Sequence, residues 1–291
     1  MKFDNVMAEI NGFGRFQKRM FILMVIPRMT LPLHFLLNNF IAAIPPHHCN
    51  ISSLDDGGLF RNLSLEDRLV VSVPVQQDGT PNSCQMFAEP QYHLLFNFSN
   101  LTDLPTVPCQ NGWMFDTTTF KSTLATEWDL VCDKKTVNKA TATIFFIGVM
   151  IGAAVFGYLS DRFGRKKMLL LSYMITSVFG FASAFSYNFP MFAAMRFFTG
   201  LGISGISIIS IVLSIEWVDI RHRTRVGVLI SLDWSVNTAL LPVLAYFVRD
   251  WRYLTATVTT PLLVAMISWR QNGLGYCSFM ARIGVSLAPL I

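Results

Sequence analysis

The chain of 291 residues is 52% hydrophobic and only 14% charged, with a mean hydropathy of +0.45 and a formal net charge of +5. This composition is too apolar for an ordinary soluble domain and indicates an integral membrane protein. The basic residues lie in short clusters between apolar stretches, without the basic stripe or aromatic platform of a nucleic-acid-binding protein, so no nucleic acid partner is expected.

Seven apolar stretches approach or exceed the length needed to cross a bilayer, which is about 20 residues. The sixth and seventh are short. The segment before the first stretch is polar and amphipathic, and the first stretch lacks a small-residue cleavage site, so we expect it to remain in the protein. The stretches cover approximately residues 20–44, 140–159, 168–187, 191–215, 226–248, 253–269 and 274–291.

Lysine and arginine residues precede the first stretch and follow the second and the fourth. Short basic connections stay on the cytosolic side of a membrane. The amino terminus, residues 1–19, is therefore expected in the cytosol, and the long segment 45–139 is expected outside. The basic residues concerned are Lys2, Arg15, Lys18, Arg19, Arg162, Arg165, Lys166, Lys167, Arg221, Arg223 and Arg225.

Several polar residues interrupt the first apolar stretch, where hydrocarbon would not accept them. Arg28, His34 and Asn38 are spread along it, together with Pro27 and Pro32. Polar groups at this depth normally face a cavity, and prolines bend helices. We therefore expect a bent helix, with Arg28, His34 and Asn38 as candidate substrate contacts.

All four N-x-[ST] sequons of the chain lie in the predicted outside segment, at Asn50, Asn62, Asn97 and Asn100. Such sequons are glycosylation acceptors in extracellular loops, so their position agrees with the charge pattern. We expect Asn50 to be too close to the membrane, and Asn97 and Asn100 to compete sterically.

Four of the five cysteines, Cys49, Cys84, Cys109 and Cys132, lie in the same segment. In an oxidising compartment they predict two disulfides, for which three pairings are possible. No C-x-x-C pair occurs, and His47 and His48 adjoin only one cysteine, so no metal site is expected.

A short polar loop joins the second and third apolar stretches. A helix must end abruptly there at the membrane surface, Gly164 permits the turn, and the cations are expected to stay in the cytosol. A plain basic loop would need neither the aspartate nor both glycines. The loop residues that we single out are Gly157, Asp161, Arg162, Gly164, Arg165 and Lys166.

The fourth apolar stretch carries Arg196 and Gly200 in the pattern R-x-x-x-G, and the second carries Gly148 and Gly152. Glycines at such intervals let a neighbouring helix approach closely. Arg196 lies about one turn from the expected outer boundary, so we interpret it as an arginine that extends its guanidinium to the membrane surface.

Glu216 and Arg223, which are separated by six residues after the fourth stretch, form a candidate charged pair. Such pairs can bias a conformational equilibrium, since each contributes little when solvated, and a plain solvated face is the alternative. In the fifth stretch Asp233 and Asn237 share one helical face. Asp233 would repel an anionic substrate unless it is protonated or paired with an arginine, and it raises the alternative of a cationic or zwitterionic substrate.

Arg282 lies within the last apolar stretch. An arginine inside such a stretch normally faces a cavity, where it attracts an anion. It is therefore our first candidate for substrate binding. The alternatives are that it reaches the membrane surface or pairs with a carboxylate.

The loop pattern G-x-x-x-D-R-x-G-R-K at residues 157–166 resembles the loop between helices two and three of the major facilitator superfamily. The sequences PPHHC at 45–49, ATEWDLVC at 125–132 and GFGRFQ at 12–17 resemble the organic ion transporters of solute carrier family 22. This second resemblance covers residues 1–269. The sequence MARIG at 280–284 is similar to the organic anion branch, whose members carry arginine at this position of helix eleven.

The resemblance implies an all-α membrane protein that contains the amino-terminal six-helix half of a major facilitator fold and one extra helix. The first transmembrane helix would cover 20–44, a glycosylated, disulfide-stapled extracellular loop 45–139, and helices two to six 140–269. Residues 270–291 resemble helix eleven, directly after an apparent deletion of helices seven to ten. The resemblance also implies that the charged loop, together with Glu216 and Arg223, forms a cytosolic gate.

The leading hypothesis is a plasma-membrane transporter that moves organic anions by exchange or facilitated diffusion. One alternative is a transport-inactive truncated isoform that associates with full-length transporters or with itself. Another is a seven-span receptor, which would require an extracellular amino terminus and is disfavoured by the basic segment 1–19. The motifs G-x-x-x-x-G-K-[ST], H-E-x-x-H and G-x-S-x-G do not occur, so we expect neither ATP-driven transport nor an enzyme, and no cofactor.

Overall fold

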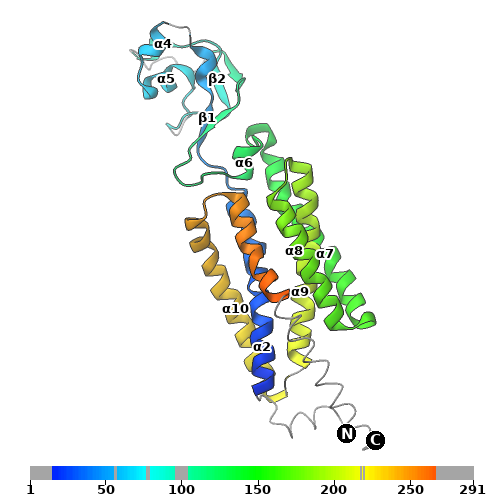
Figure 1. The fold of residues 1–291 in the computed structure, drawn as a ribbon. Coiled ribbons are helices and arrows are strands. Elements are labelled where there is room, and N and C mark those ends of the chain that lie inside the picture. Colours follow the sequence, from blue (N-terminus) through cyan, green and yellow to red (C-terminus); the bar gives the residue numbers. More distant parts are fainter. Residues whose placement is uncertain are drawn as a thin grey trace, which may run out of the picture. The chain divides into compact units, whose positions relative to one another are not determined.

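The computed structural model describes residues 15–55, 58–76, 79–95, 104–216, 218 and 220–266. They form two compact units (Figure 1). One, which we call the helical unit, contains the described residues up to Ile41 and from Ala140 onward. The other, which we call the insert, contains Ala42–Lys139.

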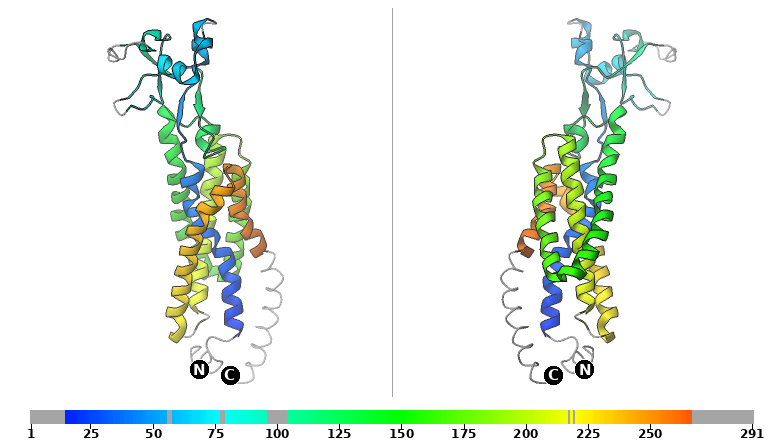
Figure 2. Two further views of the ribbon diagram at one scale, coloured as in Figure 1. Left: turned by 90° about the vertical axis from the view of Figure 1, so that its left-hand side faces the viewer. Right: turned by 90° about the vertical axis from the view of Figure 1, so that its right-hand side faces the viewer.

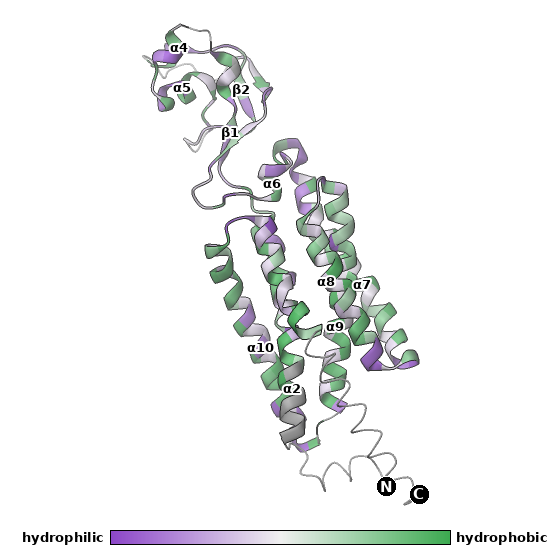
Figure 3. Ribbon diagram, in the orientation of Figure 1, coloured by the Kyte–Doolittle hydropathy of each residue, from purple (hydrophilic) through white to green (hydrophobic). Residues whose placement is uncertain are grey.

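The helical unit is a bundle of long helices that run side by side (Figure 2). Hydrophobic residues dominate most of their length (Figure 3). Within the described residues, four helices are long and apolar enough to cross a membrane. The helices of this unit are α2 (Arg15–Arg28), α3 (Thr30–Ile41), α7 (Lys135–Phe163), α8 (Arg165–Ala184), α9 (Phe189–Glu216), α10 (Ile220–Phe247) and a further helix at residues 251–266.

The first apolar stretch is divided into two helices. α2 ends at Arg28 and α3 begins at Thr30, with a turn at Met29 between them. Pro32 lies in the first turn of α3, where its missing N–H is tolerated. The Thr30 hydroxyl donates a hydrogen bond to the Pro27 carbonyl at 2.7 Å, which closes the turn. The bend expected from the prolines is therefore present, and Arg28 lies at it.

Glycines bring α7 and α9 into backbone contact. A Cβ atom added at Gly152 would lie 2.5 Å from the Leu201 carbonyl oxygen, and one added at Gly148 or Gly200 would also overlap the backbone of the facing helix. Close approach of this kind is how helices associate in a membrane. The packing role predicted for these glycines is confirmed.

The core of the helical unit lies between α7, α8 and α9. Its fully buried members include Phe145, Phe156, Tyr173 and Ile203, with Leu31 from α3 packed among them. Because this core joins the first, second, third and fourth spans, it holds the polar side chains of the first span in fixed positions relative to α9.

The insert contains short elements joined by loops. β1 pairs antiparallel with β4, placing His48 opposite Met114, and β2 pairs antiparallel with β3. In chain order the elements are β1 (His47–Cys49), η1 (Ile51–Leu54), α4 (Leu59–Asn62), α5 (Leu65–Ser72), β2 (Gln85–Phe87), η2 (Tyr92–Leu95), β3 (Thr106–Pro108), β4 (Trp113–Phe115), α6 (Leu124–Glu127) and η3 (Cys132–Lys134).

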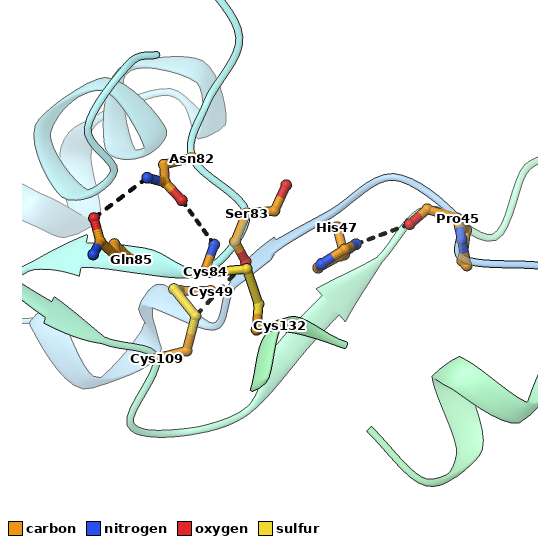
Figure 4. Close-up of a disulfide and its surroundings, with 9 residues drawn as sticks. All are labelled: Pro45, His47, Cys49, Asn82, Ser83, Cys84, Gln85, Cys109 and Cys132. Atoms are coloured by element: carbon orange, nitrogen blue, oxygen red, sulfur yellow. Dashed lines mark hydrogen bonds between the residues drawn. A yellow bond between two sulfur atoms is a disulfide. The ribbon is translucent and has the colours of Figure 1, made fainter. Parts of the chain in front are cut away.

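Two disulfides hold the insert together, Cys49 with Cys109 and Cys84 with Cys132 (Figure 4). Of the three possible pairings, the structure therefore has one. Cys49 is buried with Phe60, Val71 and Met86 in a small apolar core. His47 lies near the sulfurs of Cys84 and Cys132, but the disulfide occupies both sulfurs, so this group does not offer a set of metal ligands.

The ends of the insert are adjacent. The Asn138 side chain donates a hydrogen bond to the Ala42 carbonyl at 2.9 Å. Of the predicted glycosylation sites, Asn62 is exposed at the end of α4, whereas the Asn50 side chain accepts a hydrogen bond from the Ser52 N–H and caps η1. Asn97 and Asn100 lie outside the described residues.

Candidate functional site

The interior of the helical unit contains two groups of buried polar side chains. The first, which we call the Arg28 cluster, consists of Arg28, Ser210, Asp233 and Asn237. The second, which we call the Arg196 cluster, consists of Arg196, His34 and Thr259 together with the ring of Phe145. Ionisable residues inside a membrane span are rare and usually functional, so these clusters are the candidate site.

Arg28 is the last residue of α2 and is only 4% exposed. Its Nη1 donates a hydrogen bond to the Ser210 hydroxyl of α9 at 2.7 Å. Its Nε lies 3.9 Å from Oδ2 of Asp233 on α10. A buried cation is tolerated only when its charge is compensated, and Asp233 provides that compensation.

Asp233 is held in place by its own helix. The Asn237 amide, one turn later on α10, donates to Oδ1 of Asp233 at 2.8 Å and to its backbone carbonyl at 2.7 Å. Beside them, the Trp234 ring packs against Phe35 of α3 with ring centroids 5.6 Å apart. The sequence placed Asp233 and Asn237 on one face and allowed for an arginine partner, and in the structure that partner is Arg28.

Arg196 is fully buried. Its guanidinium lies 4.6 Å from the centre of the Phe145 ring, and its Nη1 is 3.3 Å from Nδ1 of His34. The other His34 nitrogen is 3.4 Å from the Thr259 hydroxyl. The expectation that Arg196 extends to the membrane surface is wrong, because the aromatic ring and the histidine hold it inside the bundle.

The remaining candidate of the first span, Asn38, has a hydrogen-bond partner outside both clusters. Its Oδ1 accepts a hydrogen bond from the Thr141 hydroxyl of α7 at 3.0 Å. The structure thus brings together Arg28, Asp233 and Asn237, and places His34 with Arg196. Arg282 lies outside the described residues.

Ser210 and Thr259 belong to the site, although the sequence analysis did not identify them. Ser210 belongs to a run of serines on α9 at intervals of three and four residues, which places them on one face of a helix. That spacing is the signal that was available. Thr259 is one of several threonines in its helix, and nothing in the sequence distinguishes it.

The charged loop between α7 and α8 forms a second, more exposed group. Gly164 has a φ of 92°, so it permits the abrupt turn as expected. Arg165 pairs with Glu216 at 2.9 Å and with Asp161 at 3.5 Å, which links the start of α8 to the end of α9. A Cβ added at Gly157 would meet nothing within 4 Å, so packing does not require a glycine there.

The expected pairing of Glu216 with Arg223 differs from the one observed. Glu216 pairs with Arg165, whereas Nε of Arg223 donates to the Val218 carbonyl at 3.4 Å. The reason is geometric, since the chain turns between α9 and α10 while the loop before α8 brings Arg165 to the end of α9. Of the other loop residues, Arg162 donates to the Tyr158 hydroxyl at 3.4 Å, and Lys166 follows Arg165 in the first turn of α8.

Replacing Glu216 by glutamine is expected to destabilise the protein only slightly, by about 0.2–1 kcal/mol, because the ion pair is partly exposed. Glu216→Gln should lower the melting temperature of the purified protein slightly, and Arg165→Gln should lower it at least as much, because Arg165 also pairs with Asp161. The double variant should lower it no further than Arg165→Gln alone. Arg223→Gln is the control. If Arg223→Gln alone also lowered the melting temperature, and its effect combined with Glu216→Gln were smaller than the sum of the two, the pairing expected from the sequence would be favoured.

Residues 125–287 match the Major Facilitator Superfamily. Solute carrier family 22 member 7 of Rattus norvegicus is 44% identical over 277 residues, and that of Homo sapiens is 44% identical over 280, each match covering 92% of this chain. Member 6 of Oryctolagus cuniculus is 39% identical over 274 residues. The matches cover 51%, 50% and 48% of those relatives, so the chain spans about half their length.

Among solved structures, the inward open conformation of the xylose transporter XylE from E. coli is similar, at 21% identity and a TM-score of 0.47. The match covers 51% of this chain and 41% of that protein.

Proposed function

Because this chain belongs to the major facilitator superfamily, we propose that it is a multi-pass plasma-membrane protein that transports small organic anions. The proposal includes a cytosolic amino terminus and an extracellular, glycosylated insert. The mechanism is binding and conformational alternation without a covalent step. The main support for the proposal is the 44% identity to members of solute carrier family 22 over 92% of this chain.

The observation that carries the choice of substrate is the presence of arginines inside the helical unit. Arg28 and Arg196 are both buried, and Arg196 has no carboxylate within 4 Å among the described residues. Arginine donates fixed pairs of hydrogen bonds to a carboxylate, so buried arginines suit anionic groups. Arg282 remains the first candidate for direct contact, on the resemblance to the organic anion branch.

Alternating access requires two opposing halves that rock around a site between them. In this proposal the described helices form one such half. The charged loop would act as a cytosolic latch, because Arg165 joins the beginning of α8 to the end of α9 through Glu216 and is only partly buried. A solvated ion pair of this kind opens at little energetic cost.

The experiment that tests this function is uptake of a fluorescent carboxylate by cells that express the chain. Uptake should be saturable when it is normalised to the surface-exposed protein, and Arg282→Asp should abolish it, because a carboxylate would then face the substrate's own charge. Arg61→Gln, an exposed arginine of the insert, is the matched control. Absence of saturable uptake despite surface delivery would refute transport by this chain alone.

A second candidate function is suggested by the junction of Trp269 with Arg270, where the resemblance to solute carrier family 22 passes directly to a segment like helix eleven. We propose as this alternative that the chain does not transport by itself and associates with a full-length transporter or with another copy. A tagged chain would then co-purify with full-length solute carrier family 22 member 7 and change its uptake rate. Lack of co-purification would exclude this role.

A further inference from the structure

The charges of the Arg28 cluster cancel. Arg28 contributes one positive charge from the end of α2, and Asp233 contributes one negative charge from α10. Their side chains are only 5% and 8% exposed. A carboxylate of the protein therefore already accompanies the arginine.

The contact between the two charges is nevertheless incomplete. The distance of 3.9 Å exceeds the 2.7–2.9 Å or so that is usual for a charge-assisted hydrogen bond. Arg28 instead directs Nη1 to Ser210, and Asp233 is held by Asn237. Arg28 and Asp233 therefore each have a separate hydrogen-bond partner, Ser210 on α9 and Asn237 on α10.

Two buried atoms of the cluster have unused hydrogen-bonding capacity within the described part of the chain. Nε of Arg28 is a donor without a hydrogen-bond acceptor, and Oδ1 of Asn237 is an acceptor without a donor. Buried polar atoms are almost always satisfied in folded proteins, so each such case calls for an explanation. The unused donor belongs to the cation Arg28, and the unused acceptor lies on Asn237 beside the anion Asp233. Together they suit a ligand that carries both a hydrogen-bond acceptor and a hydrogen-bond donor.

Electrostatics favours the same ligand. A simple anion bound at Arg28 would leave the cluster with an unpaired negative charge, and a simple cation at Asp233 would leave an unpaired positive charge. Unpaired charge is costly away from water. A zwitterion preserves neutrality, because its carboxylate meets Arg28 and its ammonium group meets Asp233.

We propose that Arg28 and Asp233, supported by Ser210 and Asn237, form a subsite for the head group of a zwitterionic substrate that carries a carboxylate and an ammonium group. This inference rests on the proposed function, because it takes a carboxylate-bearing substrate as given and adds the second charge. Asp233 is then the residue that distinguishes zwitterions from simple organic anions.

Three probes with one carbon skeleton separate the contributions of the two charges. They are 3-phenylpropionate, which is an anion, phenylalanine, which is a zwitterion at neutral pH, and phenethylamine, which is a cation. Binding of each is measured by calorimetry on the full chain purified in lipid nanodiscs. The expected order of affinity places phenylalanine first, by about tenfold, the equivalent of one modest charge interaction.

Two single variants should change the order in opposite ways. Asp233→Asn should weaken phenylalanine binding about tenfold and strengthen 3-phenylpropionate binding, because Arg28 is then uncompensated. Arg28→Gln should weaken both carboxylates and favour phenethylamine. Ser231→Ala is the control and should leave all three affinities unchanged, because Ser231 is an exposed serine on the same helix whose hydroxyl donates to the Gly227 carbonyl of that helix.

Either single variant leaves a buried charge alone and can impair folding. The double variant Arg28→Gln with Asp233→Asn avoids this, since it removes both charges together. Because neither charge of the subsite remains, the double variant should bind phenylalanine no more tightly than 3-phenylpropionate.

Persistence of the phenylalanine preference in the double variant would overturn the inference. Equal binding of the two carboxylates by the unmodified chain would overturn it too, and would leave the proposed anion transport intact. Failure of the chain to bind either carboxylate would refute the proposed function as well as the subsite.

Discussion

Gly152→Ala is expected to disrupt the helical unit, although it adds only one methyl group. The added Cβ would lie 2.5 Å from the Leu201 carbonyl oxygen and 2.8 Å from the Leu201 Cα. These are backbone atoms, so α9 itself must move away from α7. Overpacking of this kind costs about 1–3 kcal/mol or more. We expect a lower melting temperature in detergent and less protein at the cell surface.

The matched control is Gly157→Ala on the same helix. The space around Gly157 is open, and alanine is the better helix former, so this variant should be neutral or slightly more stable, by about 0.5–1 kcal/mol. If the two variants melted at the same temperature, the close contact between α7 and α9 would not exist in the protein.

Cys49→Ser is expected to unfold the insert. The bridge from Cys49 to Cys109 closes a separation of 60 residues, and that from Cys84 to Cys132 closes one of 48. Removing a native disulfide from a small domain costs about 2–5 kcal/mol, and this insert has only a small apolar core to resist the loss. Limited proteolysis of intact cells should cut the variant within the insert at protease levels that leave the unmodified chain whole.

The same experiment tests the pairing. Cys109→Ser should be as sensitive as Cys49→Ser, and the variant that combines them should be no worse, because both remove one bridge. Combining Cys49→Ser with Cys84→Ser should be clearly worse, because two bridges are lost. The opposite ranking would mean that the cysteines are joined in another way.

Much of the fold follows from the sequence because membrane helices are specified locally. Among the described residues, the second to sixth apolar stretches each contain a long helix, and Pro27 and Pro32 indicated a bend that lies at Met29. The seventh stretch, 274–291, lies outside the described residues. The disulfide pairing could not be derived in this way, since four cysteines allow three arrangements. Only the three-dimensional path of the insert decides among them.

The candidate site was predictable to the extent that its contacts are local. Asp233 and Asn237 are one turn apart on one helix, so their hydrogen bond follows from helical spacing. The contacts of Arg28 with Ser210, of Arg165 with Glu216 and of Arg196 with Phe145 join distant segments. Position along a helix does not reveal what faces a side chain across the bundle, which is why the interpretation of Arg196 was wrong.

The adjacency of the insert's two ends has an evolutionary consequence. Asn138 and Ala42 are hydrogen-bonded across the base of the insert, so the polypeptide departs and returns at nearly one point. A module attached in this way can lengthen, shorten or diversify while the helices that carry it keep their sequence and packing. Homologous proteins can therefore differ widely in this module while they retain the same helices.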